Sequence, residues 1–362
     1  MRIAQVAPLF ESVPPKAYGG TERVVSWLTE ELVRLGHDVT LFASGDSQTS
    51  ATLVPACEKA LWQDPSSLES LPLHVLQMEQ VLSRSSEFDV VHFHGDFIHF
   101  PLLRRVRVPS LTTLHGALNL TDHAPLFAEY PDVPLISISD AQRRLVPNGA
   151  FTATIHHGMP LDLHRFDARG GDYLAFLGRI SPQKGLDAAI RIALESGLKL
   201  KIAARIYPDE RAYYAEVIAP LIAAAGPHVE FVGEVAGAEK DAFLGGARAM
   251  LFPIAWPEPF GLVMIESLAT GTPVIAFRQG SVPEVIDHGE TGFVVDTVDQ
   301  AVAAVKRVGE IERAACRSAF EQRFGVTRMA LDYVDVYQML GERRSGPRLV
   351  SLASQRPRAA SR

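Results

Sequence analysis

Two glutamates, Glu258 and Glu266, stand eight positions apart at the ends of the segment EPFGLVMIE. Carboxylates that act together on one glycosidic bond lie about 5 to 10 Å apart. Eight residues of α-helix, however, rise about 12 Å. The spacing therefore favours two separate contacts on an extended ligand over an acid–base pair at a single bond.

The segment that holds the glutamates predicts a helix N-terminus facing this ligand. Residues 248–256 have the pattern of a strand, PEP ends it, and residues 260–269 have the pattern of a helix. The first N–H groups of a helix have no acceptor within it and lie at the positive end of its dipole, so a diphosphate fits there. The expected donors are the N–H groups of Phe260, Gly261 and Leu262. Glu258 would then contact the sugar, and Glu266 the ribose, of a nucleotide sugar.

Two cations after another predicted strand suit the same diphosphate. The turn GRISPQKG places Arg179 and Lys184 five residues apart, at the edge where doubly wound domains bind their ligands. Arginine grips a phosphate with two hydrogen bonds, while lysine acts as a mobile point charge. A solvated surface pair is the alternative. Gly233, in FVGEVAG, ends a further strand, where an open backbone would meet a flat base edge.

A glycine pair precedes the first predicted helix. In YGGTERVV, Gly19 and Gly20 lie directly before a helix that begins near Thr21. The pattern lacks the G-x-G-x-x-G fingerprint of a dinucleotide site. Glycines nevertheless let the backbone N–H groups of a helix N-terminus approach a phosphate. A plain turn is the alternative.

Three histidines stand on or after predicted strands of the first half. His115, in TLHG, is at a strand end, where it either lines a site or serves as a packed or capping side chain. His92 and His94 alternate in DVVHFHG and therefore share one face of a strand. No cysteine or third ligand accompanies them at zinc spacing. We interpret both as core or lining residues and expect no metal site.

The elements that must position these residues alternate between strand and helix along the chain. Apolar strands that are each followed by a helix predict parallel sheets covered on both faces. The predicted strands span 2–8, 38–44, 89–95, 110–116, 134–140, 173–179, 198–206, 228–234, 248–254, 272–277 and 291–296, and helical patterns include 19–38 and 67–87. Apolar periodicity lapses in LDLHRFDARGGDY and restarts at Tyr173. We therefore predict an α/β protein with two doubly wound, Rossmann-like domains facing across a cleft, over residues 1–166 and 167–325.

The composition of the 362 residues is that of a globular protein, with 47% hydrophobic and 21% charged residues. A net charge of −7 argues against a nucleic acid as partner. The two cysteines, Cys57 and Cys316, are far apart, which predicts neither a disulfide framework nor a zinc site and favours a reducing cytosol. The chain begins with a poor signal peptide, and no apolar stretch approaches about 18 residues. We expect a cytoplasmic protein.

The end of the chain, residues 342–362, has a different composition. Six arginines follow Glu342 without another acidic residue, among serine, proline and glycine. This composition predicts a disordered tail. A weak contact with the anionic inner face of a membrane is the alternative, since each basic residue near such a surface contributes about 1 kcal/mol.

Four of these segments together resemble the family 4 glycosyltransferases, which have the GT-B fold. EPFGLVMIE matches their E-x7-E motif, GRISPQKG resembles their G-R-x-x-x-x-K-G turn, YGGTERVV their glycine-rich first loop, and TLHG their first-domain histidine. The motifs stand in family order, and the match runs from Met1 to about Leu340. The resemblance implies a retaining transfer in which the second domain binds the nucleotide sugar and the first contributes to the acceptor side. It also implies that a helix over 326–341 crosses back to the first domain.

The resemblance assigns roles to individual residues. The expected catalytic residues are His115 close to the reacting sugar, Glu258 holding the donor sugar, and Arg179 and Lys184 stabilising the departing diphosphate. The expected donor-binding residues are Gly19, Gly20, Gly233, Phe260, Gly261, Leu262 and Glu266. No D-x-D motif stands near a strand end, which agrees with a reaction that needs no metal ion and no cofactor besides the nucleotide sugar as co-substrate.

The chain departs from the family pattern in IHHGMPLDLHRF, where many members have an Asn-Gly turn, so the roles of His156 and His157 stay open. The resemblance implies a donor that is UDP-, GDP- or ADP-linked and an acceptor that is a sugar, a lipid-linked molecule or a small molecule. A sugar-nucleotide epimerase on the same fold is an alternative function, which activity without an acceptor would reveal. A catalytically silent sugar-nucleotide-binding partner is another, which the intact set of cations and glutamates disfavours.

Overall fold

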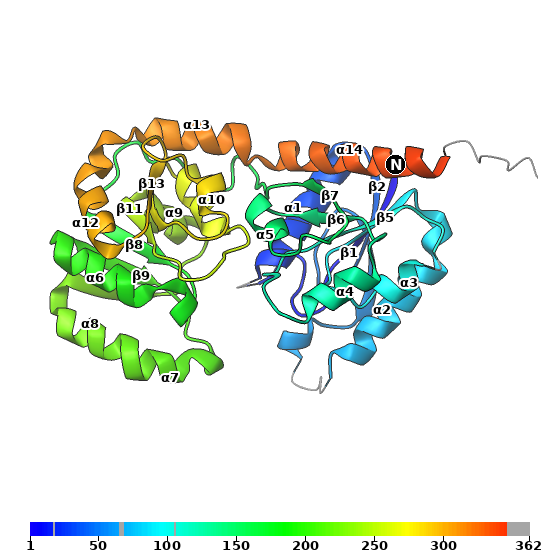
Figure 1. Ribbon diagram of the computed structural model, residues 1–362, viewed down its shortest axis with the longest axis horizontal. Coiled ribbons are helices and arrows are strands. Elements are labelled where there is room, and N and C mark those ends of the chain that lie inside the picture. The colour runs from blue at the N-terminus through cyan, green and yellow to red at the C-terminus, as the bar shows by residue number, and fades with distance from the viewer. Residues whose placement is uncertain (17–18, 65–68, 105, 346–362) are drawn as a thin grey trace, which may run out of the picture.

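The computed structural model describes residues 1–16, 19–64, 69–104 and 106–345. Figure 1 shows two α/β lobes side by side, the first coloured blue to cyan and the second green to yellow. Two helices, α13 (Arg313–Arg323) and α14 (Val326–Ser345), run along one edge of both lobes. The predicted fold class, two parallel-sheet Rossmann-like domains, is confirmed.

The first domain is built on a seven-stranded parallel sheet with the order β3-β2-β1-β4-β5-β6-β7. Its strands are β1 (Arg2–Val6), β2 (Asp38–Ser44), β3 (Thr52–Cys57), β4 (Val90–Phe93), β5 (Ser110–Thr113), β6 (Leu135–Ser137) and β7 (Phe151–Thr154). Its helices are α1 (Gly20–Arg34), α2 (Leu71–Ser83), α3 (Phe100–Leu103), α4 (His123–Glu129) and α5 (Asp140–Arg144). The sheet order reverses direction at β1, and residues that follow β1, β4 and β5 therefore meet at one sheet edge.

The two faces of this sheet are covered by different helices. Ile3 packs with Leu28 of α1 and Tyr333 of α14, whereas its neighbour Ala4 belongs to a separate cluster with Phe127 of α4. Successive side chains of a strand point to opposite faces, which explains the division. The buried apolar run of β1 thus supports a helical layer on each side.

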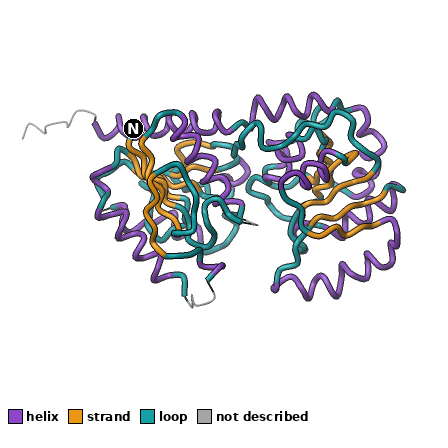
Figure 2. The backbone as a smooth tube through the Cα atoms, turned by 180° about the vertical axis from the view of Figure 1, so that it is seen from behind, coloured by secondary structure: helices purple, strands orange, loops and turns teal. Residues whose placement is uncertain are grey.

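The second domain has a six-stranded parallel sheet with the order β10-β9-β8-β11-β12-β13. Its strands are β8 (Tyr173–Leu177), β9 (Lys199–Ala203), β10 (Val229–Gly233), β11 (Ala247–Phe252), β12 (Val274–Phe277) and β13 (Gly292–Val295). Its helices before α13 are α6 (Leu186–Ser196), α7 (Arg211–Tyr213), α8 (Ala219–Ala225), α9 (Gly237–Gly245), α10 (Leu262–Ala269), α11 (Val282–Val285) and α12 (Val298–Arg307). Helix α6 packs against α12, and α10 against α13. Figure 2 shows both sheets between their helices from behind.

The chain passes between the domains twice, and the two passages lie side by side. The N–H of Met159 donates to the carbonyl of Phe324, and the N–H of Val326 donates to the carbonyl of Met159, both at 2.9 Å. The chain already meets the second domain at His164, whose Nδ1 lies 2.6 Å from Asp241 Oδ1. The first passage therefore comes a few residues before 166, where the sequence predicts the domain division.

Sequence periodicity misses the two edge strands of the first sheet, β3 and β7. Strand β3 is half-exposed and contains Pro55, and all four residues of β7 are partly exposed. An edge strand buries less surface and tolerates proline, so its sequence shows neither a continuous apolar run nor regular alternation. Each of the predicted strands overlaps an observed one.

Helix boundaries also differ from the predictions. Helix α10 begins at Leu262, two residues later than expected, because Gly261 adopts a left-handed backbone with φ of 80°. Helix α14 continues to Ser345, beyond the expected end at 341, since Glu and Arg are good helix formers. The rest of the predicted basic tail, 346–362, lies outside the described residues, as do 67 and 68 of the second predicted helix. No helix in the described ranges is both long and apolar enough to cross a membrane.

Candidate active site

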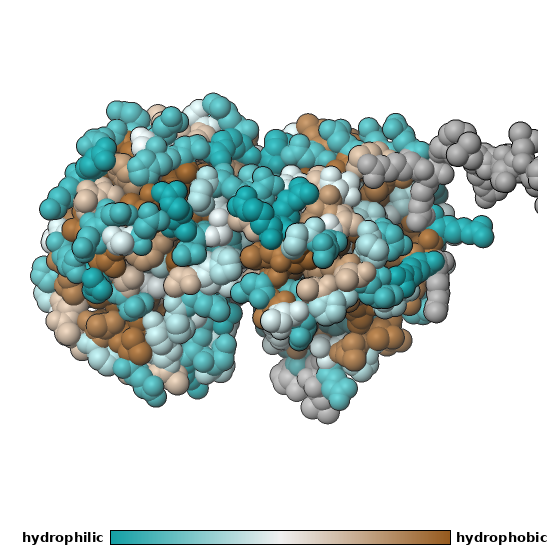
Figure 3. All heavy atoms as spheres, viewed as in Figure 1, coloured by the Kyte–Doolittle hydropathy of each residue, from teal (hydrophilic) through white to brown (hydrophobic). Residues whose placement is uncertain are grey.

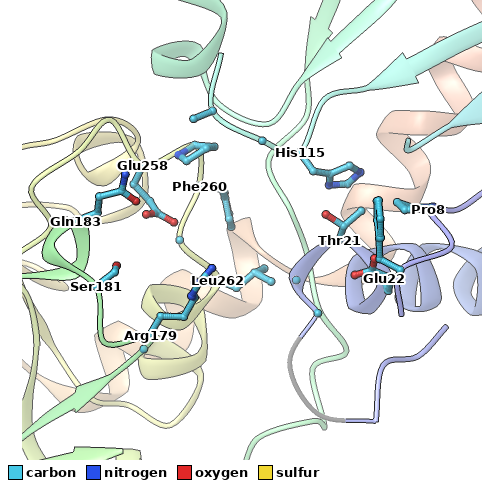
Figure 4. A pocket seen from close by; sticks show the side chains of 18 of the residues that line it. Pro8, Thr21, Glu22, His115, Arg179, Ser181, Gln183, Glu258, Phe260 and Leu262 are labelled. Atoms are coloured by element: carbon cyan, nitrogen blue, oxygen red, sulfur yellow. The ribbon is translucent and has the colours of Figure 1, made fainter. Parts of the chain in front are cut away.

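A cleft of about 1040 Å³ lies between the two domains and is lined by residues of both. Figure 3 shows the surface hollowed between the lobes at the lower edge of the view. Figure 4 shows the two walls, with Arg179 and Glu258 on the second domain opposite His115 and Glu22 on the first. The lining also includes Gly19, Gly20, Lys184, Phe260, Gly261 and Leu262. Most of the site residues expected from the sequence therefore come together here.

Lys184 and Glu258 form an ion pair in this cleft. Lys184 Nζ lies 2.7 Å from Glu258 Oε2, and the indole N–H of Trp256 donates to the same oxygen at 2.6 Å. Lys184 ends a short 3₁₀ turn, η3 (Pro182–Lys184), which Gly185 closes with a φ of 69°. A Cβ at Gly185 would collide with the carbonyl oxygen of Pro253. Glycine therefore lets this turn lie against the end of β11, which brings Lys184 to Glu258.

Arg179 follows β8 on the same wall and is held by acidic residues. Its Nε donates to Glu210 Oε1 at 2.7 Å, and its Nη2 lies 3.2 Å from Asp209 Oδ2. Its guanidinium also lies over the ring of Tyr207, 4.9 Å from the centroid. The arginine is about one-third exposed. A neighbouring turn, η4 (Pro208–Glu210), thus positions the charge of Arg179 at the cleft. The sequence alone did not predict this contact.

The N-terminus of α10 opens into the cleft beside these cations. Among the described residues, the backbone N–H groups of Gly261, Leu262 and Val263 have no hydrogen-bond acceptor. Phe260 lies outside the helix, its side chain is buried, and its carbonyl accepts a hydrogen bond from Ser281 Oγ at 2.8 Å. The N–H of Phe260 likewise has no acceptor among the described residues, so the three expected donors stay a prediction and Val263 adds a fourth. The positive end of the helix dipole thus lies beside Lys184, whose own charge is paired with Glu258.

Two expected donor-binding residues, Glu266 and Gly233, lie outside the cleft lining. Glu266 is 5% exposed, and its Oε1 accepts a hydrogen bond from Lys240 at 2.9 Å and lies 3.9 Å from His164 Nε2. Burial alone would raise the pKa of Glu266, but the charges of Lys240 and His164 hold the pKa below its ordinary value. The two glutamates of the E-x7-E segment thus each have a lysine partner of their own.

His115 lies on the opposite wall within a group of buried histidines. Its ring stacks on that of His157, with centroids 5.2 Å apart, and His157 in turn packs edge-on against Phe260 at 5.0 Å. Burial lowers the pKa of His115 to about 3 and that of His157 well below its ordinary value, so both rings are neutral at pH 7. His157 therefore connects the two walls, which the sequence pattern gave no means of anticipating.

The structure also shows the positions of His92, His94 and His156. His94 lines the cleft and His92 is completely buried, in keeping with their interpretation as lining and core residues. His156 Nε2 lies 3.1 Å from Glu284 Oε2 at the interface between the domains. The Glu284 carboxylate also accepts hydrogen bonds from the N–H groups of Asp140 and Ala141 at the start of α5, both at 2.7 Å.

Glu22 is a cleft residue that the sequence reasoning missed. It lies in the first turn of α1, behind the glycine pair, and only 6% of it is exposed. Burial, with a smaller contribution from the charge of Glu11, raises its pKa to about 7. A carboxylate two residues after the glycine pair was the available signal. In the described ranges, no three His, Cys, Asp or Glu side chains are grouped so that they could hold a metal ion.

Known protein families match both halves of the chain. The family described as "Glycosyltransferase Family 4" matches residues 18–175, and that described as "Glycosyl transferases group 1" matches residues 167–322. A glycogen synthase of Mycobacterium tuberculosis is 28% identical, over 93% of this chain and 95% of its own. A phosphatidyl-myo-inositol mannosyltransferase of Mycolicibacterium smegmatis is 25% identical, over 89% and 88%.

Solved structures share the same architecture. AviGT4, a glycosyltransferase involved in avilamycin A biosynthesis, superposes with a TM-score of 0.72 at 25% identity, covering 96% of this chain and 99% of its own. Anabaena HepE, solved in complex with UDP and glucose, superposes with a TM-score of 0.72 at 20% identity, covering 94% and 100%. The likeness extends over both domains.

Proposed function

The chain belongs to the family 4 glycosyltransferases with the GT-B fold, and from this premise we propose that it works with retention of configuration and without a metal ion. It transfers a sugar from a nucleotide-sugar donor. In the proposal the diphosphate of the donor binds the second domain, and the acceptor enters from the first. HepE, which shares the fold, was solved with UDP-glucose, so UDP-sugars are the donors to test first.

The observation that carries the proposal is the convergence of positive groups on one wall of the cleft. Lys184, Arg179 and the first residues of α10 all line the cleft, and Figure 4 shows Arg179 and Leu262 on the wall opposite His115. As the glycosidic bond breaks, negative charge develops on the diphosphate, and preorganised charges that meet it can lower the barrier by several kcal/mol. These groups perform the task that a metal ion would otherwise perform.

The remaining roles follow from the positions of the side chains. Glu258, already fixed by Lys184 and Trp256, would accept hydrogen bonds from the donor sugar. A Cβ at Gly20 would make an ordinary contact with Leu262 Cδ1 at 3.8 Å, so the start of α1 lies close to α10 across the cleft. The acceptor would then attack on the face that the diphosphate leaves, which retains the anomeric configuration.

Product analysis tests this function directly. The protein is incubated with UDP-, GDP- and ADP-sugars, with and without a cell extract as source of acceptors, and products are identified by mass spectrometry. We expect donor consumption that depends on the extract, and a product whose anomeric configuration, measured by NMR at early times, equals that of the donor. An inverted product would refute retention, and conversion of the donor without an acceptor would indicate an epimerase.

Turnover should survive an excess of EDTA. The cations of the second domain and the N-terminus of α10 supply the positive charge that the leaving diphosphate needs. Initial rates are compared before and after dialysis against the chelator. Loss of turnover that either Mg²⁺ or Mn²⁺ restores would show that these groups are insufficient.

Glu266→Ala should weaken binding of the preferred nucleotide sugar by about 1.5 to 3 kcal/mol, the usual contribution of hydrogen bonds to a charged group. The reason is the proposed contact of this carboxylate with the ribose diol, for which the diol must displace or share the ammonium group of Lys240. Calorimetric titration measures the dissociation constant.

Lys240→Met is the matched control for this prediction, because it removes the partner of Glu266 and leaves the carboxylate in place. If Glu266 contacts the ribose, Lys240→Met should bind the donor much better than Glu266→Ala does. Equal losses in both variants, at unchanged melting temperature, would mean that Glu266 serves only to hold Lys240.

A further inference from the structure

A chain of hydrogen bonds runs through the core of the first domain from α14 to the cleft. Gln5 Nε2 donates to the Tyr337 hydroxyl at 3.1 Å, and Gln5 Oε1 lies 2.7 Å from His94 Nε2. His94 Nδ1 in turn lies 2.9 Å from His115 Nε2. These four residues are named the Gln5 relay below. The relay connects the helix that returns from the second domain with the histidine on the cleft wall.

A branch leaves the relay at the Tyr337 hydroxyl. His92 Nδ1 lies 2.8 Å from this hydroxyl, and His92 Nε2 lies 2.7 Å from Thr113 Oγ1. Thr113 Oγ1 is also 2.9 Å from the hydroxyl of Tyr333. The Tyr337 hydroxyl accepts from Gln5, and its single proton is then available to His92 Nδ1.

Burial makes the direction of each hydrogen bond matter. Gln5 and His92 are completely buried, and His94 and Tyr337 are nearly so. Burial holds the pKa values of His92 and His94 well below their ordinary range, so each ring is neutral and carries one N–H and one lone pair. Two facing N–H groups, or two facing lone pairs, would be costly in this buried interior. The direction of one bond therefore determines the direction of the next.

The orientation of the Gln5 amide thus determines the tautomer of His115. With Oε1 toward His94, the amide can only accept, so His94 carries its proton on Nε2 and its Nδ1 is an acceptor. His115 must then donate from Nε2, and its Nδ1 keeps a lone pair. A reversed amide would donate to His94, and the proton of His115 would move to Nδ1.

The Nδ1 atom of His115 is the unpaired end of the relay. It is buried and has no hydrogen-bond partner among the described residues. The ring itself lines the cleft, opposite the wall that carries Lys184 and Glu258. A lone pair at this position suits a hydroxyl donor, whereas an N–H would suit an acceptor.

We propose that Gln5 and Tyr337 are positioning residues that hold His115 as its Nε2–H tautomer, so that Nδ1 accepts a hydrogen bond from a hydroxyl group of the bound sugar substrate. The proposal rests on the proposed function for the identity of the ligand. It gives α14 a second task besides packing, because the helix supplies the hydroxyl that orients the Gln5 amide. Residues in the core of the domain, which do not contact the substrate, would thus set the hydrogen bond between His115 and a sugar hydroxyl.

NMR of the protein labelled with ¹⁵N-histidine tests the tautomer without any substrate. We expect the wild-type His115 to show a protonated Nε2 and an unprotonated Nδ1, with the resonances assigned by comparison with His115→Gln. Gln5→Met keeps a similar volume and removes both hydrogen bonds of the amide. In this variant, and in Tyr337→Phe, His115 should show a mixture of tautomers or the reversed one.

Thr327→Val is the matched control, because it removes from the same helix a hydroxyl that donates to Glu31, outside both the relay and its branch. It should leave the His115 tautomer unchanged. For turnover with the preferred donor, Gln5→Met should lower kcat/KM by about tenfold or more, the scale of a lost or mispaired hydrogen bond, whereas Thr327→Val should stay near wild type. Tyr337→Phe should lie between them, since the amide keeps its contact with His94.

Several results would overturn the proposal. Among them are a proton on Nδ1 of wild-type His115, an unchanged tautomer in both relay variants, and a changed tautomer with unchanged kcat/KM. If Gln5→Met does not fold, Tyr337→Phe decides by the same measurements. The spectra are recorded without turnover. A failure to detect sugar transfer would therefore count against the proposed function, while the measured tautomer of His115 would still stand.

Discussion

Replacing Lys184 by methionine should lower kcat by about 100-fold or more, while KM for the nucleotide sugar changes much less. Negative charge grows on the diphosphate as the glycosidic bond breaks, so the ammonium group interacts more strongly with the transition state than with the bound donor. Removal of one preorganised charge-stabilising group has effects of this size in other enzymes. Methionine keeps the aliphatic stem, and steady-state kinetics with the preferred donor measure the loss.

The ion pair with Glu258 requires a second variant. Lys184→Met leaves the buried Glu258 carboxylate with the indole N–H of Trp256 but without its cation. Lys184→Met/Glu258→Gln removes that unpaired charge. If activity is lost because the diphosphate lacks its cation, the double variant should be as inactive as Lys184→Met. If the unpaired carboxylate is the cause, the double variant should regain activity.

Lys201→Met is the matched control for the lysine substitution itself. Lys201 lies over the ring of Tyr173 on the second sheet, outside the cleft lining, and its replacement should leave both kinetic constants near wild type. A Lys184→Met enzyme with a raised KM and a nearly normal kcat would indicate uniform binding of donor and transition state. Lys184 would then have no role in the chemical step.

Tyr333→Ala should destabilise the first domain by about 3 to 5 kcal/mol, the range for large aromatic residues replaced in a core. Tyr333 is 1% exposed and packs with Ile3 of β1 and Leu28 of α1, so the substitution leaves a cavity between α14 and the sheet. Denaturant unfolding, followed through the transition of the first domain, measures the loss.

Two variants on the same helix separate the contributions. Tyr333→Phe removes only the hydroxyl that bonds Thr113 and should cost about 1 kcal/mol. Leu331, which is 48% exposed, is the surface control, and Leu331→Ala should change stability by no more than about 0.5 kcal/mol. If Tyr333→Ala were no worse than Leu331→Ala, α14 would not be part of the core of the first domain.

The positions of Arg179, Lys184 and the start of α10 could be predicted because each depends on a short segment. A strand, a turn and a helix start follow one another within about ten residues, and the carboxyl ends of parallel strands meet at one edge. The first residue of α10 was harder to predict from the sequence. Gly261 takes a left-handed backbone, and a Cβ there would come within 2.9 Å of Met264 Cε and 3.2 Å of Phe252 Cζ. That constraint arises from packing and is not visible in the helical pattern.

The E-x7-E segment shows the limit of spacing arguments. Its length indicated two separate contacts, and the structure gives Glu258 and Glu266 separate lysine partners. The partner of Glu266, however, comes from α9, and only Glu258 reaches the cleft lining. Glu258 also lies before α10, so helical spacing does not set the separation of the two carboxylates. Nor does the spacing show which of them the neighbouring elements leave open to a ligand.

The sequence by itself determined the alternation of strands and helices, the two domains and the turns that carry the cations, because periodicity and turn chemistry act within a few residues. Only the tertiary structure decided which buried polar groups meet. Gln5 bonds Tyr337, 332 positions away, and His157 stacks between His115 of one domain and Phe260 of the other. A buried polar group takes whichever partner the packing of distant elements places beside it, since leaving it unpaired is costly. No local pattern records that choice.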